Sequence, residues 1–219
     1  MVNTAVSVQH VYMELKKERV LYDVSRDFEE GKIHGIIGNN GSGKTVLFKC
    51  ICGFLIPAQG RILVDYGQVG CDMDFPEDLG FIIETPGFLP NLSGIKNMQI
   101  LASLRKKIGI MEIVEAIRYM GFDTAMKKLV GKYFPGMRQR LGIAQAIMEN
   151  PSLLILDEPF NGLDKHGVED MRELIKGLRN SGKTILLASH NVADIDELCD
   201  TVCETDAGKL VVVRSVVIR

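Results

Sequence analysis

The sequence has no long apolar run and no block of like charge. Its 219 residues include 26 Lys and Arg against 28 Asp and Glu, so the formal net charge is -2. No stretch approaches the roughly 18 to 20 consecutive apolar residues that cross a bilayer, so if a membrane is involved we expect another chain to span it. Because nucleic-acid-binding surfaces concentrate Lys and Arg, the even balance of charge does not favour nucleic acid as a partner.

Cysteine is scarce and odd in number, and the first five residues lack the basic and apolar regions of a secretory signal peptide. Both features favour a reducing cytosol over a compartment that forms disulfides. The cysteines are Cys50, Cys52, Cys71, Cys199 and Cys203. Their spacings match no common zinc-ligand pattern, and no histidine lies near either close pair in the sequence. We therefore expect buried thiols rather than a zinc site.

Short apolar segments alternate with segments of helical periodicity over most of the chain. The apolar segments with strand character are 33–37, 61–64, 153–157 and 184–188. Residues 6–11 and 20–24, ahead of them, have the pattern of antiparallel strands. Apolar strands separated by helices indicate a parallel sheet covered on both faces. We therefore predict one α/β domain over residues 1–219, with a mainly parallel sheet and an antiparallel β part.

A mainly helical insertion is expected between two parts of this core. From residue 86 to about 141, apolar residues recur at helical spacing, and a helix is predicted over 97–107. The core would then comprise approximately residues 1–85 and 142–219. The sequence shows no internal repeat and no low-complexity tail, and we expect no added regulatory domain.

One segment has a specific spacing for binding phosphate groups. Residues 38–45 are Gly-Asn-Asn-Gly-Ser-Gly-Lys-Thr, between a predicted strand and a predicted helix. The glycines let successive backbone N–H groups converge on an anion at the positive end of the helix. Lys44 adds a positive charge for the β- and γ-phosphates, and the Thr45 hydroxyl is placed to bind Mg²⁺. A glycine-rich turn without a ligand is the weaker interpretation. The nucleotide-binding residues expected here are Gly38, Asn39, Asn40, Gly41, Ser42, Gly43, Lys44, Thr45 and Val46, with Lys44 also catalytic.

Two adjacent carboxylates follow the buried segment 153–157. In a sheet that carries a phosphate loop, this strand end lies beside the nucleotide, so Asp157 is predicted to act as a Mg²⁺ carboxylate, usually through water. Glu158 is predicted to polarise the water that attacks the γ-phosphate. The plainer interpretation is that both residues only cap a helix.

His190 and Tyr12 are further candidates for the site. His190 follows the segment 184–188 and should emerge at the same rim of the sheet as Glu158, which favours a catalytic role over a structural one. Tyr12 lies well upstream of the phosphate loop and is a candidate for stacking on adenine. A tyrosine in a strand often serves only in packing, so this second interpretation stays open.

With these residues in place, the chain resembles the ATP-binding cassette of ABC transporters, from about residue 6 to its C-terminus. The resemblance includes residues 38–45, the two acids, the turn 161–164, His190, and the segment 133–141 in the position of the family's signature at the start of a helix. It implies a P-loop NTPase fold and an ATPase that uses ATP and Mg²⁺. It also implies nucleotide contacts from three more residues, namely Gly136, Asp164 and Glu84. Glu84 would be a metal ligand as well.

The resemblance further implies a head-to-tail pair formed with a second copy or a homologous cassette. Each ATP would lie between the phosphate loop of one cassette and the signature segment of the other, whose helix N-terminus faces the γ-phosphate. Hydrolysis would separate the pair and drive transport through an integral membrane permease on a separate chain. The cassette would be cytoplasmic and peripheral on the inner face of the cell membrane, with residues 90–94 facing the permease.

Two residues depart from the family pattern. Phe134 stands where the family usually has a serine, and Pro135 removes one backbone N–H donor, so we expect a weaker or slower closed dimer. Glu84 stands where glutamine is usual, and its carboxylate keeps a metal-ligand oxygen but adds negative charge near the γ-phosphate. It looks like the variant found in exporters that protect producer cells against lantibiotic peptides. A neutral substitution is the plainer explanation.

Two other functions fit parts of this pattern. A soluble ABC-type ATPase that acts on ribosomes or DNA would usually have a second cassette with a charged linker, or a long coiled coil, and the sequence has neither. A nucleotide-binding scaffold that hardly hydrolyses ATP would fit the two departures. The retained lysine, two acids and histidine argue against it.

Overall fold

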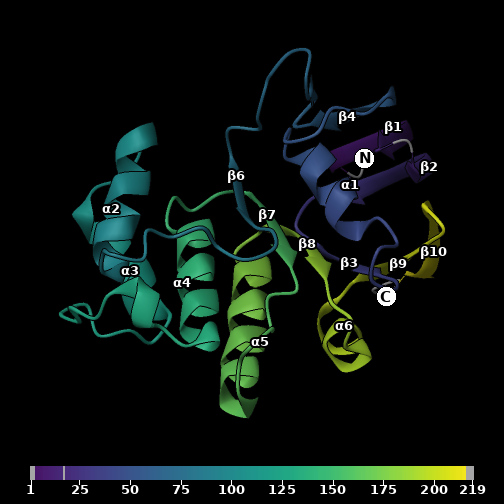
Figure 1. Ribbon diagram of the computed structural model, residues 1–219. Helices are drawn as coiled ribbons and strands as arrows, with labels where there is room; N and C mark the ends of the chain where they lie inside the picture. Colours follow the sequence, from purple (N-terminus) through teal and green to yellow (C-terminus); the bar gives the residue numbers. More distant parts are fainter. Residues whose placement is uncertain (1–2, 17, 216–219) are drawn as a thin grey trace.

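Two β-sheets and their helices make up the computed structural model, which describes residues 3–16 and 18–215 (Figure 1). The larger sheet has the strand order β10-β9-β3-β8-β7-β6. Its strands are β3 (Ile33–Ile37), β6 (Leu79–Ile82), β7 (Leu153–Asp157), β8 (Thr184–Ala188), β9 (Thr201–Asp206) and β10 (Lys209–Ser215). All neighbouring pairs are parallel except β9 with β10. The predicted, mainly parallel sheet is confirmed.

The smaller sheet is antiparallel and has the order β2-β1-β4-β5. Its strands are β1 (Thr4–Leu15), β2 (Glu18–Glu29), β4 (Gln59–Val64) and β5 (Gly67–Gln68). The segments predicted as antiparallel strands lie in β1 and β2, which pair with each other along most of their length. Both strands extend beyond the predicted ranges, because cross-strand pairing continues into polar positions that show no apolar alternation.

Six helices complete the part of the chain that the structure describes. They are α1 (Lys44–Ile51), α2 (Gly94–Arg105), α3 (Ile110–Tyr119), α4 (Pro135–Ile147), α5 (Lys165–Asn180) and α6 (Val192–Leu198), with a short 3-10 helix at Val130–Lys132. The helix predicted over 97–107 is α2, which starts earlier and ends at Arg105 because Lys106 is left-handed, with φ +55°. None of the described helices combines the length and apolarity needed to cross a bilayer.

Alternating side chains of the larger sheet pack into two separate cores. On β7, Leu154 and Leu156 join the apolar cluster formed with α4 and α5, whereas Leu153 and Ile155 join the cluster formed with α1 and the smaller sheet. This period-two division follows from strand geometry. The prediction that the parallel sheet is covered on both faces is therefore confirmed, with a β-sheet supplying part of one cover.

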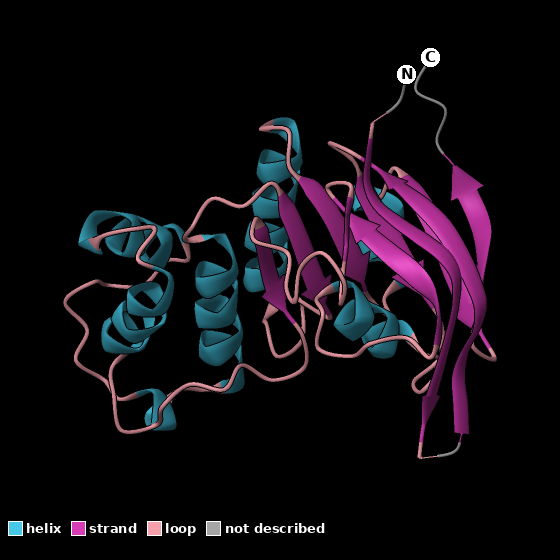
Figure 2. Ribbon diagram, turned by 90° about the horizontal axis from the view of Figure 1, so that it is seen from above, coloured by secondary structure: helices cyan, strands magenta, loops and turns pink. Residues whose placement is uncertain are grey.

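The helices α2 and α3 lie at one end of the molecule, away from most strands (Figures 1 and 2). Between them and the sheet lies α4, which contacts α3 on one side and β6 on the other. The division into a core and a helical subdomain at about residues 86 and 141 stays a prediction, and α4 runs across the second boundary.

All five cysteines are free thiols. Cys50, Cys52, Cys199 and Cys203 are buried, as predicted. Cys71 is exposed, so the expectation of a buried thiol is wrong at this position, because Cys71 lies in a turn after β5 rather than in a strand or helix of the core.

A fully buried histidine lies in the middle of the larger sheet. His34, on β3, has no exposed surface. Its Nε2 donates to the carbonyl oxygen of Glu29 at 2.8 Å, so Nδ1 of the neutral ring accepts from the Thr201 hydroxyl at 2.7 Å. Burial lowers the pKa of His34 below its ordinary value of 6.5, although the bond to Glu29 acts in the opposite direction. The folded state therefore favours the neutral ring.

This burial predicts a specific dependence of stability on pH. Below pH 6.5 the unfolded chain binds a proton at His34 more readily than the folded chain does, so the free energy of unfolding falls as pH decreases through this value. His34→Gln should reduce the slope of unfolding free energy against pH between about pH 7 and 5.5, measured by urea denaturation. His166→Gln, at a side chain that is 90% exposed, is the control and should retain the wild-type slope. Equal slopes in all three proteins would contradict the prediction.

Candidate functional site

The phosphate loop joins β3 to α1 in a conformation that requires glycine at two positions. Gly38 has φ +143° and Gly43 has φ +108°, a region that side chains with a Cβ rarely adopt. A Cβ at Gly38 would lie 2.4 Å from the carbonyl oxygen and Oγ1 of Thr205, and one at Gly43 would lie 2.9 Å from a methyl group of Leu21. The loop is thus pressed against β9 and β2, and close packing requires its glycines independently of any ligand.

The side chain of Lys44 is buried and folds back over the loop. Only 7% of the residue is exposed, and Nζ donates to the carbonyl oxygens of Gly38 at 2.6 Å and Asn39 at 3.1 Å. Within the described residues, Lys44 forms no ion pair with a carboxylate. Its positive charge is therefore free to interact with a phosphate group placed on the loop.

Thr45 and Asp157 meet between the start of α1 and the end of β7. The Thr45 hydroxyl donates to Oδ2 of Asp157 at 2.7 Å. Asp157 is only 6% exposed, and this burial raises the pKa of its carboxyl above the ordinary value. The Thr45 hydroxyl and the Lys44 charge oppose the shift, while the charges of Glu158 and Glu84 add to it. Burial thus outweighs the stabilisation that Thr45 and Lys44 give to the charged carboxylate.

These groups fit a hard divalent cation. A hydroxyl and a carboxylate provide only oxygen atoms, which are the ligands that Mg²⁺ prefers. Among the described residues, no three His, Cys, Asp or Glu side chains cluster to form a complete metal site. A cation held by Thr45 and Asp157 would therefore need further oxygen ligands from phosphate and water, as Mg²⁺ in nucleotide sites usually does.

Glu84 follows β6 and is engaged by another element. Its Oε1 accepts from Nζ of Lys49, on α1, at 2.7 Å, and its side chain is 62% exposed. The residue has a left-handed backbone, with φ +58°. It also lines the cavity beside the phosphate loop. A role as a metal ligand stays a prediction, and it would require the carboxylate to share or leave its bond with Lys49.

Glu158 and His190 are in direct contact at the rim of the sheet. Nδ1 of His190 lies 2.7 Å from Oε2 of Glu158, and the backbone N–H of His190 donates to the same oxygen at 3.4 Å. The backbone of Glu158 is left-handed, with φ +52°, and its N–H donates to the carbonyl oxygen of Ala188. Its carbonyl oxygen accepts from the Gln139 side chain at 3.1 Å. The histidine and α4 therefore both hold this glutamate.

A cavity of about 470 Å³ lies over the phosphate loop. Its lining includes predicted residues from three separate segments, namely Asn40, Gly41, Gly43, Lys44, Thr45, Val46, Glu84, Asp157 and Glu158. His190 lines a neighbouring hollow together with Gly38 and Asn39. The structure thus brings the predicted loop, acids and histidine to one edge of the sheet. The Ser42 hydroxyl bonds to that of Thr205, on β9, at 2.6 Å.

Sequence reasoning missed four residues that also line this cavity: Val20, Thr85, Gln139 and Asn161. Val20 is brought there by the contact of β2 with the loop, which no local pattern indicates. Gln139 lies in the signature segment and Asn161 in the turn 161–164, so both belong to motifs that the resemblance includes. Their place in those motifs is the signal in the sequence that could have assigned them to the site.

Three predicted residues from outside the phosphate loop line neither this cavity nor the neighbouring hollow, namely Tyr12, Asp164 and Gly136. Tyr12, on β1, packs edge-on against Tyr22 with ring centroids 5.4 Å apart. Oδ1 of Asp164 accepts from the backbone N–H of Gly167 and caps α5. The nucleotide contacts proposed for these residues stay predictions.

Gly136, the third of them, lies against the turn 161–164 instead. A Cβ at Gly136 would lie 2.6 Å from the carbonyl oxygen of Gly162, so the start of α4 and this turn can approach only with glycine here. Phe134 precedes it at the N-cap of α4, provides no side-chain cap and is 72% exposed. Lys128 places its ammonium 4.9 Å from the Phe134 ring. The start of α4 thus presents an aromatic surface where a capping hydroxyl would be expected.

Comparison with known proteins gives a consistent result. A family model described as ABC transporter matches residues 21–161. The ABC transporter ATP-binding protein YybJ of Bacillus subtilis is 37% identical over 94% of this chain and 94% of its own length. The bacitracin transport ATP-binding protein BcrA of Enterococcus faecalis is 35% identical over 94% of this chain and 68% of its own length. The lantibiotic transport ATP-binding protein SrtF of Streptococcus pyogenes is 32% identical over 94% and 89%.

Solved structures share the fold. The structure of an ATP-binding subunit of an ABC transporter superposes with a TM-score of 0.85 at 24% identity, covering 96% of this chain and 90% of that one. The cassette MJ0796, solved as a dimer in a post-hydrolysis state bound to ADP and Pi, gives a TM-score of 0.84 at 20% identity over 96% and 99%. The predicted fold class is therefore confirmed.

The burial of Asp157 predicts the effect of neutralising it. Burial raises the folded-state pKa of Asp157, so the free energy of unfolding decreases as pH rises through that pKa and the carboxyl becomes charged. At pH 7 the charged carboxylate therefore destabilises the folded protein. Asp157→Asn should therefore raise the melting temperature of the nucleotide-free protein at pH 7, and it should also abolish the extra stabilisation that Mg²⁺ gives in the presence of ATP. Differential scanning fluorimetry with ATP, with and without Mg²⁺, measures both effects. Asp206→Asn, at an exposed position on β9, controls for the change in net charge. A lower melting temperature for Asp157→Asn without nucleotide would argue against the account of this site.

Proposed function

The chain belongs to the ABC transporter family and is an ATP-binding subunit that hydrolyses ATP, and on this premise we propose how its own residues perform the reaction. The observation that supports the proposal best is the pair of contacts Thr45–Asp157 and Glu158–His190, beside one cavity at one edge of the sheet. The first pair provides oxygen ligands, and the second provides a base held in place.

In this proposal the backbone N–H groups of residues 38–45 bind the β- and γ-phosphates, and Lys44 transfers its bonds from the loop carbonyls to phosphate oxygens. Thr45 and Asp157 would hold Mg²⁺. When bound, this ion neutralises charge that develops on the phosphate oxygens. Tyr12, if its ring turns from Tyr22, stacks on adenine.

Glu158 is the proposed catalytic carboxylate. It accepts a hydrogen bond from the attacking water and so orients the water toward the γ-phosphate. His190 fixes the position of this carboxylate through its ring and its backbone N–H. Gln139 holds the backbone of the same residue from α4, so the helix that begins with the signature segment is connected to the catalytic glutamate.

We further propose that the cassette works as a head-to-tail dimer, with a second copy or a homologous cassette, on a membrane permease. The start of α4 and the turn 161–164 are in close backbone contact at Gly136 and Gly162. Both would face the nucleotide bound by the partner cassette. Residues 90–94 would face the permease. The protein would then be cytoplasmic and peripheral on the inner face of the cell membrane.

The proposed cargo class is a peptide of the bacitracin or lantibiotic kind. Two relatives are named for transport of bacitracin and of a lantibiotic. Glu84 resembles the variant found in exporters that protect producer cells against lantibiotic peptides. The other functions considered from the sequence, a ribosome- or DNA-acting ATPase and a weakly hydrolysing scaffold, are not favoured.

Removing the proposed base gives a direct test of the reaction. Glu158→Gln should lower kcat for ATP hydrolysis by about 10² to 10⁴-fold, because a positioned carboxylate supplies a rate effect of this order. The affinity for Mg-ATP should remain, since the amide keeps the size of the side chain and Lys44, Thr45 and Asp157 are intact. Phosphate release and the binding of a fluorescent ATP analogue measure the two quantities. Glu115→Gln, at an exposed position on α3, is the control. Unchanged turnover in Glu158→Gln would sink the assignment.

The exposed Phe134 predicts a gain of dimer stability on restoring a hydroxyl. Phe134→Ser in a Glu158→Gln background should tighten the ATP-dependent dimer about tenfold per site, because a hydrogen bond to a charged phosphate contributes about 1.5 kcal/mol or more. Analytical ultracentrifugation with Mg-ATP measures the dissociation constant. Phe134→Ala removes the ring without adding a hydroxyl, so an equal gain with alanine, or no gain with serine, would count against the prediction.

A further inference from the structure

A buried ion pair joins α5 to α6 close to the predicted catalytic histidine. Oδ1 of Asp194, on α6, accepts from Nε of Arg172 at 3.0 Å and from Nη2 at 2.5 Å. Asp194 is 1% exposed, while the Arg172 side chain is 20% exposed. The bond to Asp194 raises the pKa of Arg172 above its ordinary value. The two helices lie next to each other below the larger sheet in Figure 1.

The same carboxylate reaches the segment that contains His190. Its second oxygen, Oδ2, accepts from the hydroxyl of Ser189 at 3.4 Å. That hydroxyl in turn accepts from the backbone N–H of Asn191 at 3.2 Å. Ser189 is buried, at 1% exposure. Bonds that lead back to Asp194 therefore hold the residues on both sides of His190.

The histidine ring itself has little packing to fix it. Its side chain is 67% exposed, and Glu158 is its hydrogen-bond partner. An exposed ring on a short loop samples other rotamers unless its backbone is held. The placement of His190 against Glu158 therefore depends on the backbone of residues 189–191. The Asp194 carboxylate supports this backbone through Ser189, while the start of α6 holds Asn191.

We propose that Arg172 and Asp194 are positioning residues for ATP hydrolysis, which act through Ser189 to hold His190 against Glu158. This proposal rests on the proposed function of His190 and Glu158. Arg172 is required because a carboxylate as buried as Asp194 needs a cationic partner, and removal of that partner would leave an uncompensated charge. The carboxylate would then draw in water or move toward solvent, and Ser189 would lose its anchor. The contact of Arg172 with Glu197, at 2.7 Å, is more exposed and contributes less.

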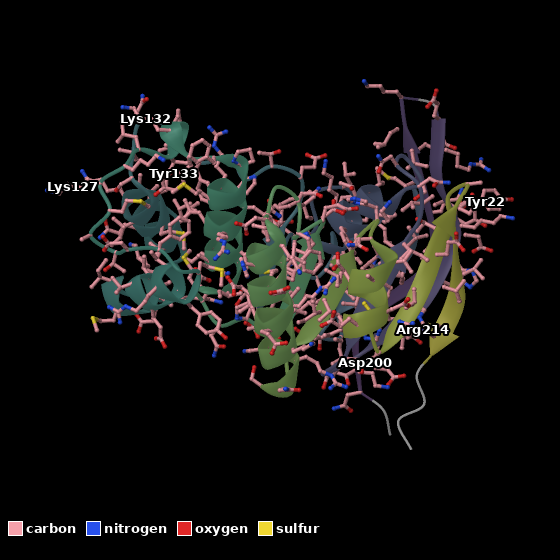
Figure 3. All side chains as sticks on the ribbon, turned by 90° about the horizontal axis from the view of Figure 1, so that it is seen from below. Tyr22, Lys127, Lys132, Tyr133, Asp200 and Arg214 are labelled. Carbon is pink, nitrogen blue, oxygen red and sulfur yellow. The ribbon has the colours of Figure 1, made fainter. Side chains whose placement is uncertain are left out.

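A neighbouring ion pair provides a matched control. Arg179, also on α5, donates from Nη2 to Oδ1 of Asp200 at 2.6 Å. Asp200, labelled in Figure 3, bonds to the backbone N–H of Ile33 at the start of β3 and has no bond to Ser189. Arg179→Met thus removes an arginine of the same helix and a similar ion pair without touching the support of His190.

The first experiment measures kcat and nucleotide affinity of the full chain. Arg172→Met should lower kcat by about tenfold or more, because small displacements of catalytic groups have effects of this size. The Kd for a fluorescent ATP analogue with Mg²⁺ should change less than about twofold, because the phosphate loop is unaffected. Arg172→Lys, which keeps the charge but not the forked contact, should give an intermediate kcat and provides a second variant if Arg172→Met does not fold. Arg179→Met should retain wild-type kcat. The proposal would be overturned if kcat of Arg172→Met, or of Arg172→Lys where Arg172→Met does not fold, were as high as that of Arg179→Met.

A double-mutant cycle with His190→Ala separates positioning from a general effect on structure. If Arg172 acts through His190, the Arg172→Met change should have no further effect on kcat once His190 is alanine. Effects that multiply would show that Arg172 acts by another route and would refute the positioning role. The two levels of the proposal can also fail separately. If His190→Ala leaves kcat unchanged, the proposed function of His190 falls and the positioning role falls with it. If His190→Ala lowers kcat and the Arg172 variants do not, only the positioning role falls.

Discussion

The parallel pairing of β3 with β8 and of β8 with β7 is the constraint on which the site depends. It places the phosphate loop after β3, the acids after β7 and the histidine after β8 at the same edge of the sheet. The register matters as much as the order. Asp157 pairs with Ala188, and the N–H of Glu158 donates to the Ala188 carbonyl, so Glu158 and His190 leave the sheet side by side. A slip of one residue would turn one of them to the opposite face.

Two buried charged groups at this edge, Asp157 and Lys44, bond to uncharged partners. Asp157 is buried beside Glu158, with Glu84 contributing to the same field, and the pKa of Asp157 is raised as a result. The buried ammonium of Lys44 bonds meanwhile to neutral carbonyl groups of its own loop. A nucleotide triphosphate with a divalent cation fits both groups, since the carboxylate would hold the cation and the lysine would bind the phosphates. The burial of the Asp157 carboxylate therefore lowers the free energy of unfolding of the protein at neutral pH.

The fold and the chemistry-bearing positions could be predicted from the sequence because they lie at strand ends and in a fixed loop spacing. The apolar segments at 153–157 and 184–188 are strands with those same bounds. Contacts between distant side chains could not be predicted in this way. The bond of Glu84 to Lys49 and that of Gln139 to the Glu158 backbone each join residues from separate elements, and the local sequence contains no signal for the pairing. The same holds for Arg172 and Asp194, because acidic and basic residues on two helix faces are usually solvated.

Calorimetric titration of the purified chain with ATP tests most directly whether Lys44 and Asp157 together bind one nucleotide with its magnesium ion. Saturable binding should appear with Mg²⁺ present, weaken strongly when the ion is chelated, and be lost in Lys44→Ala. An absence of measurable affinity for Mg-ATP, or the same affinity in Lys44→Ala as in the wild-type protein, would contradict the account.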